Sequence, residues 1–175
     1  MFNKLFGFLL FIILLPFIIL ILILNYIILK GHNPIYSQIR IGKNNIPFNI
    51  YKFKTIIDDE SNYFGKFLRA SKLDELLQLF NILNGTMVFI GPRPELIDKA
   101  QSFANIFDNY NQRHLIKPGI TGWAQIHFPD AKADDVALKL PLDIYYVKNK
   151  SIKLDLIIIR KTLHIILNRL FNDKT

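Results

Sequence analysis

The sequence predicts an α+β protein, mostly helical with a small antiparallel β-hairpin, an N-terminal re-entrant or spanning membrane helix, and interfacial amphipathic helices. Three observations support this fold class. A long apolar run lies near the N-terminus, an alternating segment of hairpin type follows it, and apolar stripes at helical spacing recur farther along the chain. With 175 residues and 51% hydrophobic side chains, the chain can bury the core of one domain.

The first element is an apolar run from Phe8 to Leu29, interrupted only by Asn25. A helix needs about 20 residues to cross a bilayer core, and this run is too long for a signal peptide. Pro16 removes a backbone donor in its middle and favours a kink. Basic residues flank both ends, so the positive-inside rule favours a re-entrant hairpin with both ends on the cytoplasmic side, while a bent span stays open. We therefore divide the chain into a membrane helix, residues 1–30, and a membrane-associated cytoplasmic domain, residues 31–175.

The composition narrows the range of partners. The 22 Lys and Arg residues against 14 Asp and Glu residues give a net charge of +8, which suits phospholipid, a phosphorylated substrate or nucleic acid. No nucleic-acid recognition motif accompanies the charge, so we expect no nucleic acid partner. The chain has no cysteine, which excludes a disulfide framework.

The second element is a β-hairpin. Apolar and polar residues alternate from Ile35 to Ile41, a turn covers Gly42 to Asn45, and a second apolar series runs from Phe48 to Phe53. Aromatic and basic residues mix from Tyr51 to Lys54, a composition that also suits single-stranded nucleic acid. Beside a membrane helix, we expect these side chains, Lys52 included, at the lipid interface.

The third element is a helix predicted over residues 71–85, whose apolar residues recur at i, i+3, i+4 and i+7. Ser71 is predicted as its N-cap and Gly85 as its C-terminal residue. Asp74 and Glu75 occupy its first turn. They either complement the positive end of the helix dipole, or divide catalytic work, with one attacking and the other holding a metal.

Two arginines accompany this carboxylate pair. Arg69 lies five residues before Asp74, and Arg93 stands between two prolines after a short strand-like run, Thr86 to Ile90. The prolines stiffen the loop that presents Arg93. A guanidinium can bind a phosphate through two parallel hydrogen bonds, although a surface charge and a structural turn are the simpler interpretations.

The C-terminal half continues with a helical pattern from Ser102 to His114 and a tight turn from Pro118 to Trp123. Arg113 and Lys117 flank the loop between them, where we expect contact with phospholipid. His114 has no metal-like spacing to another histidine, so it receives no catalytic role.

The last element is an apolar helix from Leu154 to Phe171 with a basic face, which suits a helix lying in the membrane interface. The alternative is that it docks against the hairpin and a partner subunit. A homodimer therefore stays open.

Several separated motifs carry a family resemblance. The segments LDELLQLFNILNGTMVFIGPRPEL, KPGITGWAQ and LPLDIYYVKNKSIKLDL follow one another in the order found in the bacterial sugar transferase family, the monotopic phosphoglycosyl transferases. The upstream segment IYSQIRIGKNNIPFNIYKFKT resembles the part of that family that follows its membrane helix. The resemblance covers nearly the whole chain and is to the small, single-domain form.

The resemblance implies an enzyme of the bacterial inner membrane with its catalytic domain on the cytoplasmic face. Members move a phosphosugar from a UDP-sugar to polyprenyl phosphate, giving polyprenyl diphosphosugar and UMP, with Mg²⁺ assisting. Carried over to this chain, Asp74 is the nucleophile that forms a covalent phosphosugar intermediate, and Glu75 is the Mg²⁺ ligand. The resemblance also places Arg69, Arg93, Asp143 and Asp155 in the region that binds substrate and phosphate.

Two departures from the family pattern concern the membrane helix. The family usually has Asp where this chain has Gly7, and Ser before the proline where it has Leu15. The chain also lacks the Gly-Arg-Asn that many members have after GWAQ. A conventional membrane glycosyltransferase that releases UDP and a non-catalytic membrane-tethered scaffold are the alternatives.

Overall fold

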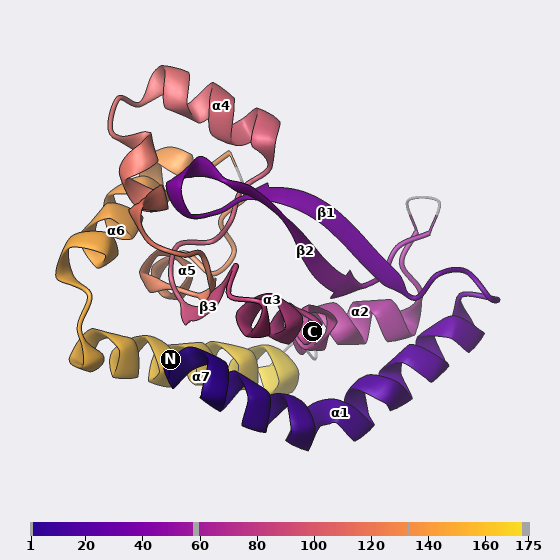
Figure 1. Cartoon of the computed structure of the whole chain (residues 1–175). Helices are drawn as coiled ribbons and strands as arrows, with labels where there is room; N and C mark the ends of the chain where they lie inside the picture. The colour runs from indigo at the N-terminus through magenta and orange to yellow at the C-terminus, as the bar shows by residue number, and fades with distance from the viewer. Residues whose placement is uncertain (1, 58–59, 133, 173–175) are drawn as a thin grey trace. The chain divides into compact units, whose positions relative to one another are not determined.

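Helices dominate the computed structural model, which describes residues 2–57, 60–132 and 134–172. The predicted class is confirmed, since the first two strands form a hairpin sheet among helices (Figure 1). In chain order the elements are α1 (Phe2–Ile28), β1 (Ile35–Ile41), η1 (Lys43–Asn45), β2 (Pro47–Phe53), α2 (Tyr63–Ala70), η2 (Leu73–Glu75), α3 (Gln78–Leu83), β3 (Val88–Ile90), α4 (Ile97–Ile106), η3 (Tyr110–Leu115), β4 (Gly119–Thr121), α5 (Trp123–His127), α6 (Val136–Asn149) and α7 (Ile152–Asn172), where η denotes a 3₁₀-helix.

The chain divides into two compact units. The first contains Met1–Gln38, Ile50–Gly85 and Ile166–Thr175, and the second contains Ile39–Asn49 and Thr86–Ile165. The β1–β2 hairpin and α7 contribute residues to both units. The predicted boundary between a membrane helix, residues 1–30, and a catalytic domain stays a prediction.

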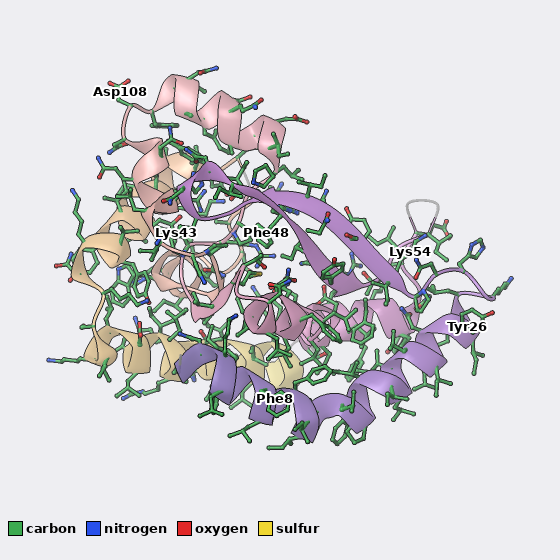
Figure 2. All side chains as sticks on the ribbon, in the orientation of Figure 1. Phe8, Tyr26, Lys43, Phe48, Lys54 and Asp108 are labelled. Atoms are coloured by element: carbon green, nitrogen blue, oxygen red, sulfur yellow. The ribbon has the colours of Figure 1, made fainter. Side chains whose placement is uncertain are left out.

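Helix α1 is bent near its middle, and Pro16 lies inside it (Figure 1). Pro16 supplies no N–H to the helical hydrogen bonds, which explains a bend there. Within the described part of the chain, α1 is the helix long and apolar enough to cross a membrane. An 18-residue stretch of it has a mean hydropathy of 3.3, and 17% of that stretch is buried. Phe8 and Tyr26, labelled in Figure 2, are about half exposed (52% and 53%). Whether α1 spans a bilayer or re-enters on one side stays a prediction.

The first unit packs α1 closely against α3. A Cβ atom at Gly7 would lie 3.0 Å from Cγ2 of Ile82, so the glycine permits this approach. The rings of Phe11 and Phe80 meet edge to face with centroids 4.9 Å apart. The absence of a side chain at Gly7, where the resembling family usually has Asp, therefore has a packing role in this chain.

The far end of α1 is fixed by a buried amide. Asn25 is 1% exposed, and its Nδ2 donates to the carbonyl oxygens of Pro34 and Lys54 at 3.1 and 2.8 Å. The chain leaves the helix through a turn in which Lys30 and Gly31 have positive φ angles of 52° and 84°. Asn25, the polar interruption in the apolar run, thus anchors both ends of the hairpin to α1.

The helix predicted over residues 71–85 is wrong in its N-terminal half. Helix α2 ends at Ala70, and Ser71 donates to the carbonyl oxygen of Phe67 at 2.8 Å, so it closes α2 instead of opening a new helix. Lys72 then adopts a left-handed φ of 61°, and a 3₁₀ turn precedes the short helix α3. The prediction for Gly85 is confirmed, because it follows α3 with a φ of 85°.

In the second unit, β3 and β4 form a parallel pair, with Val88 opposite Gly119 and Ile90 opposite Thr121. A Cβ atom at Gly119 would lie 2.1 Å from the backbone nitrogen of Gly91, so only glycine fits where β4 begins beside β3. The pairing brings together two motifs that are separated in sequence. The predicted strand at Thr86 to Ile90 is confirmed, whereas β4 replaces part of the predicted turn.

Helices α4, α6 and α7 supply most of the second unit's core. Helix α4 ends at Ile106, and a 3₁₀-helix follows, so the single helix predicted from Ser102 to His114 is wrong in its second half. Helix α6 was not predicted, whereas α7 was. Two buried clusters form this core: Ile41, Ala100, Phe103, Tyr110, Val136, Leu140 and Ile144 in one, and Ile90, Ile126, Tyr146, Leu154 and Ile158 in the other.

His114 ties η3 to the hairpin turn. Its Nδ1 is hydrogen-bonded to Oδ1 of Asn45, and since an amide oxygen accepts, Nδ1 carries the proton. Burial, together with the positive charge of Arg113, lowers the pKa of His114 to about 4. The imidazole is therefore neutral at pH 7.

This buried imidazole predicts acid sensitivity. The unfolded chain binds a proton near pH 6.5 and the folded chain only near 4, so the stability that neutral His114 provides is present above pH 6.5 and is lost as the pH falls towards 4. Denaturant unfolding in detergent should show a loss of about 2–3 kcal/mol between pH 7 and pH 4.5. His114→Gln should lack this component, and an equal pH dependence in both proteins would contradict the assignment.

Candidate functional site

Asp74 and Glu75 lie in the 3₁₀ turn η2, between α2 and α3, and both are buried. The left-handed backbone of Lys72 turns the chain sharply after α2 and sets the direction of this turn. The backbone N–H of Glu75 donates to the carbonyl oxygen of Lys72 at 3.2 Å. Two adjacent carboxylates are thus withdrawn from water on a tight turn, a placement that requires charge compensation.

Part of that compensation comes from the hairpin. The Nζ atom of Lys52 lies 2.7 Å from Oε1 of Glu75, and the two side chains are 17% and 7% exposed. The predicted interfacial position of Lys52 is therefore wrong. Composition alone placed this aromatic and basic stretch at the lipid surface, but the fold turns the Lys52 ammonium towards a buried carboxylate.

Helix α3 also anchors the hairpin. Asn81 is fully buried, and its Oδ1 accepts a hydrogen bond of 3.3 Å from the backbone nitrogen of Tyr51. Gln78 is buried on the same helix. Because Tyr51 immediately precedes Lys52, the Asn81 contact helps to fix the strand that carries the lysine.

Arg69 belongs to the same segment of the first unit. It occupies the last turn of α2, its side chain is exposed, and its carbonyl oxygen accepts a 3.2 Å bond from the N–H of Lys72. The structure therefore brings Arg69, Asp74 and Glu75 together in one short α2–η2 segment. Its role in binding phosphate stays a prediction.

Arg93 belongs to the second unit. It is the exposed member of its loop, whereas Pro92, Pro94 and Glu95 are buried. We predicted that a stiff loop presents Arg93. Two parts of this prediction are confirmed: Pro92 and Pro94 are buried, and the Arg93 side chain is exposed. Phosphate binding by Arg93 stays a prediction.

Asp143 is buried on α6 and forms a 2.7 Å ion pair with Nη2 of Arg113. Burial raises the pKa of Asp143 above its ordinary value, and Arg113 opposes this shift. Burial also disfavours the charged form of Arg113, but Asp143, Tyr110 and Glu95 together outweigh it, so the pKa of Arg113 is raised. The expectation that Arg113 meets phospholipid is wrong, since the side chain is 3% exposed and pairs inside the second unit.

Asp155 lies at the start of α7. Its Oδ1 accepts a 2.7 Å hydrogen bond from the hydroxyl of Tyr146, which also lies 3.3 Å from the carbonyl oxygen of Ile90. Burial raises the pKa of the Tyr146 hydroxyl, and its hydrogen bond to Asp155 adds to the shift. Asp155 thus helps to fix α6 and α7 at the end of β3. Contacts of Asp143 and Asp155 with a substrate stay predictions.

A metal site needs donor atoms of the right kind. Over the described residues, no group of three or more His, Cys, Asp or Glu side chains is arranged to hold an ion. Mg²⁺ needs fewer protein ligands than such a group provides, because proteins commonly bind it through one or two carboxylates together with substrate phosphates. The carboxylates of Asp74 and Glu75 fit that pattern.

Comparison with known proteins gives a match over nearly the whole chain. The family model described as "Bacterial sugar transferase" matches residues 1–169. A UDP-N-acetylgalactosamine-undecaprenyl-phosphate N-acetylgalactosaminephosphotransferase of Aeromonas hydrophila is 36% identical over 174 residues, which cover 89% of this chain and 41% of that protein.

Two further relatives have similar levels of identity. An uncharacterized sugar transferase of Bacillus subtilis is 36% identical over 152 residues, covering 79% of this chain and 73% of that protein. A UDP-glucose:undecaprenyl-phosphate glucose-1-phosphate transferase of Klebsiella pneumoniae is 34% identical over 142 residues, covering 71% of this chain and 30% of that protein. The chain therefore spans less than half the length of the Aeromonas and Klebsiella relatives.

The contact between Lys52 and Glu75 predicts a specific stability loss. Lys52→Met leaves the Glu75 carboxylate buried without this partner, and it should lower the free energy of unfolding by about 3 kcal/mol at pH 7. Lys52→Arg keeps a cation and should recover most of the loss.

The matched control is Lys54→Met, two residues along the same chain segment (labelled in Figure 2), with an expected change within about 0.5 kcal/mol. Denaturant unfolding in detergent measures all three variants. Equal stability of Lys52→Met and Lys54→Met would show that the ion pair contributes nothing to folding.

Proposed function

The chain belongs to the bacterial sugar transferase family, and from this membership we propose that it transfers a phosphosugar from a UDP-sugar to polyprenyl phosphate. The products are polyprenyl diphosphosugar and UMP. The observation that carries the proposal is the buried carboxylate pair Asp74 and Glu75, in which Glu75 forms an ion pair with Lys52, within a family match that covers almost the entire chain.

The relatives support the substrate classes. The names of the Aeromonas and Klebsiella proteins share undecaprenyl phosphate as the acceptor and a UDP-linked sugar as the donor, but differ in the sugar, N-acetylgalactosamine in one and glucose in the other. For this chain we therefore propose a polyprenyl phosphate acceptor and a UDP-sugar donor, with the sugar left unspecified.

In the proposed reaction, an oxygen of the ionised Asp74 carboxylate attacks the β-phosphorus of the UDP-sugar. The bond between that phosphorus and the bridging oxygen breaks, UMP leaves with the electron pair, and a phosphosugar is joined to Asp74. An oxygen of polyprenyl phosphate then attacks the same phosphorus and releases the carboxylate. Two displacements allow a soluble donor and a lipid acceptor to react in turn.

The attack requires compensation of the donor's negative charge. Lys52 fixes Glu75 and places a positive charge beside the pair, and we propose that Arg69 and Arg93 bind phosphate oxygens of the donor. Glu75 would hold Mg²⁺ together with the donor, where the ion would supply Lewis-acid neutralisation of the diphosphate while Asp74 attacks. The helix dipole expected from residues 71–85 is reduced, since α3 has only 6 residues, which makes the side-chain cations more important.

Helices α1 and α7 support the proposed placement at a membrane. Helix α1 exposes a continuous apolar surface, and α7 exposes Leu156, Leu163 and Leu167 among basic residues. We propose that both contact the bacterial inner membrane and that the carboxylate pair acts on its cytoplasmic face. An anchored site of this kind can meet the phosphate of a polyprenol at the lipid surface.

The mechanism predicts that Asp74→Asn abolishes transfer. The amide is no nucleophile, so the rate should fall by a factor on the order of 10⁴ or more. With a UDP-sugar labelled in its β-phosphate, the wild type should release UMP and retain label on the protein when the acceptor is omitted, whereas the variant should do neither.

Each alternative gives a different result in the same assay. A conventional glycosyltransferase releases UDP, and a scaffold protein releases no nucleotide and traps no label. The variant must remain folded and membrane-bound, as judged by circular dichroism and flotation with vesicles. Wild-type turnover by Asp74→Asn would contradict the nucleophilic role.

Removal of divalent cations should also stop transfer. Exhaustive chelation is expected to reduce the rate at least about a hundredfold, because the diphosphate charge is then poorly compensated, and added Mg²⁺ should restore it. Glu75→Gln should raise the Mg²⁺ concentration needed for half-maximal activity. Undiminished activity after chelation would contradict the metal role of Glu75.

A further inference from the structure

The loop from Pro92 to Glu95 offers little of its backbone to a ligand. Pro92 and Pro94 have no N–H group, and both rings are buried together with Glu95. Arg93 is the member of this loop that is exposed. Any function of the loop in binding is therefore concentrated on Arg93.

The carbonyl groups of this loop are all engaged. Four successive carbonyl oxygens accept hydrogen bonds from groups outside the loop: Pro92 from the N–H of Gly119 at 3.0 Å, Arg93 from Nη2 of Arg113 at 2.8 Å, Pro94 from Nη1 of Arg40 at 3.4 Å, and Glu95 from the N–H of Ile41 at 2.9 Å. These bonds, added to the two fixed proline φ angles, restrict the backbone conformation at Arg93. Two of them come from side chains, the Arg113 bond to Arg93 and the longer Arg40 bond to Pro94.

The Arg113 side chain is unusually constrained. The same Nη2 atom of Arg113 lies 2.7 Å from Oδ2 of Asp143, and Nη1 donates to the hydroxyl of Tyr110 at 2.9 Å. Asp143 and Tyr110 are 2% and 0% exposed. A planar guanidinium has donors in a fixed fork, so partners on both sides determine its orientation.

The charges around Arg113 keep it ionised. Asp143 is in direct contact, Oε1 of Glu95 lies 3.9 Å from Nη1, and Lys139 approaches the same Glu95 oxygen at 3.8 Å. Burial disfavours the cation, yet these carboxylates raise the pKa of Arg113. A buried charge with this many partners is costly to build, and its hydrogen bond to the loop suggests a use beyond folding.

We propose that Arg113 is a positioning residue that acts through Arg93. Its guanidinium holds the Arg93 carbonyl and thereby fixes the direction in which the exposed Arg93 side chain leaves the loop, so that it meets a phosphate of the UDP-sugar donor. Asp143 contributes by orienting Arg113. The identity of the ligand, a UDP-sugar, rests on the proposed function. The restraint that Arg113 places on the loop rests on the hydrogen bonds described above.

Arg113→Lys tests the inference, because lysine keeps the charge near Asp143 but cannot form the same set of bonds. Hydrogen–deuterium exchange of a peptide covering residues 88–96 should become at least about fivefold faster. The KM for the UDP-sugar should rise about tenfold, the effect of losing one well-formed charged hydrogen bond. A purely structural role would reduce the active fraction, and therefore kcat, without changing KM.

Two further variants separate positioning from instability. Phe103→Leu weakens the core cluster that contains Tyr110 but keeps Arg113 and its hydrogen-bond partners, so neither the exchange nor the KM should change. In an Arg93→Ala background, Arg113→Lys should cause no additional rise in KM, because the residue through which it acts is missing. If Arg113→Lys does not fold, Asp143→Asn, which leaves Arg113 in place, should give both shifts at smaller size.

The outcomes are distinct. Unchanged exchange in a folded Arg113→Lys protein overturns the restraint. Faster exchange with an unchanged KM, or an additional KM rise in the Arg93→Ala background, overturns the action through Arg93. If the wild type transfers no phosphosugar, the proposed function fails and the role in donor binding with it, while the exchange measurement still decides whether Arg113 holds the loop.

Discussion

Charges withdrawn from water need partners, and this constraint organises both units of the chain. In the first unit, buried Glu75 is paired with Lys52 from the hairpin. In the second, buried Asp143 is paired with Arg113. Breaking such a pair leaves an uncompensated charge, so each one restricts which strand, helix and loop can pack together. Under the proposed function, this burial has a use, because chemistry with anionic phosphates requires cations and carboxylates in fixed positions.

The sequence predicted the elements that depend on local patterns. Alternation predicted the hairpin, and apolar length predicted α1 and α7. It did not predict the interruption at Lys72, because a left-handed residue inside an apolar helical stripe has no signature when that residue is lysine. The predicted stripe is wrong as a buried pattern: Leu77 is in the core, but Phe80 is 43% exposed, and the polar side chains of Gln78 and Asn81 are buried instead. The backbone is a 3₁₀ turn followed by a short helix, so the faces differ from those of one continuous helix.

The candidate site was predictable in its residue types but not in its contacts. Asp74 and Glu75 were identified from adjacency and resemblance; the structure buries both, and their catalytic roles stay predictions. Lys52 and Arg113 were assigned to lipid because isolated cations beside apolar residues usually lie at an interface. Their partners are 23 and 30 residues away along the chain, so only the folded arrangement reveals them.

The close approach of Gly119 to Gly91, where β3 and β4 pair, has a consequence for how such a protein can evolve. A methyl group on Gly119 would collide with Gly91, so the GPRP and KPGITG motifs are packed backbone against backbone. They therefore tolerate little independent change, although 27 residues separate these glycines. Under the proposed function, these packed motifs bind the phosphates, which all UDP-sugar donors share. A new sugar preference would then have to arise in more adaptable surroundings, and the stretch after GWAQ, where this chain already departs from the family pattern, offers that freedom.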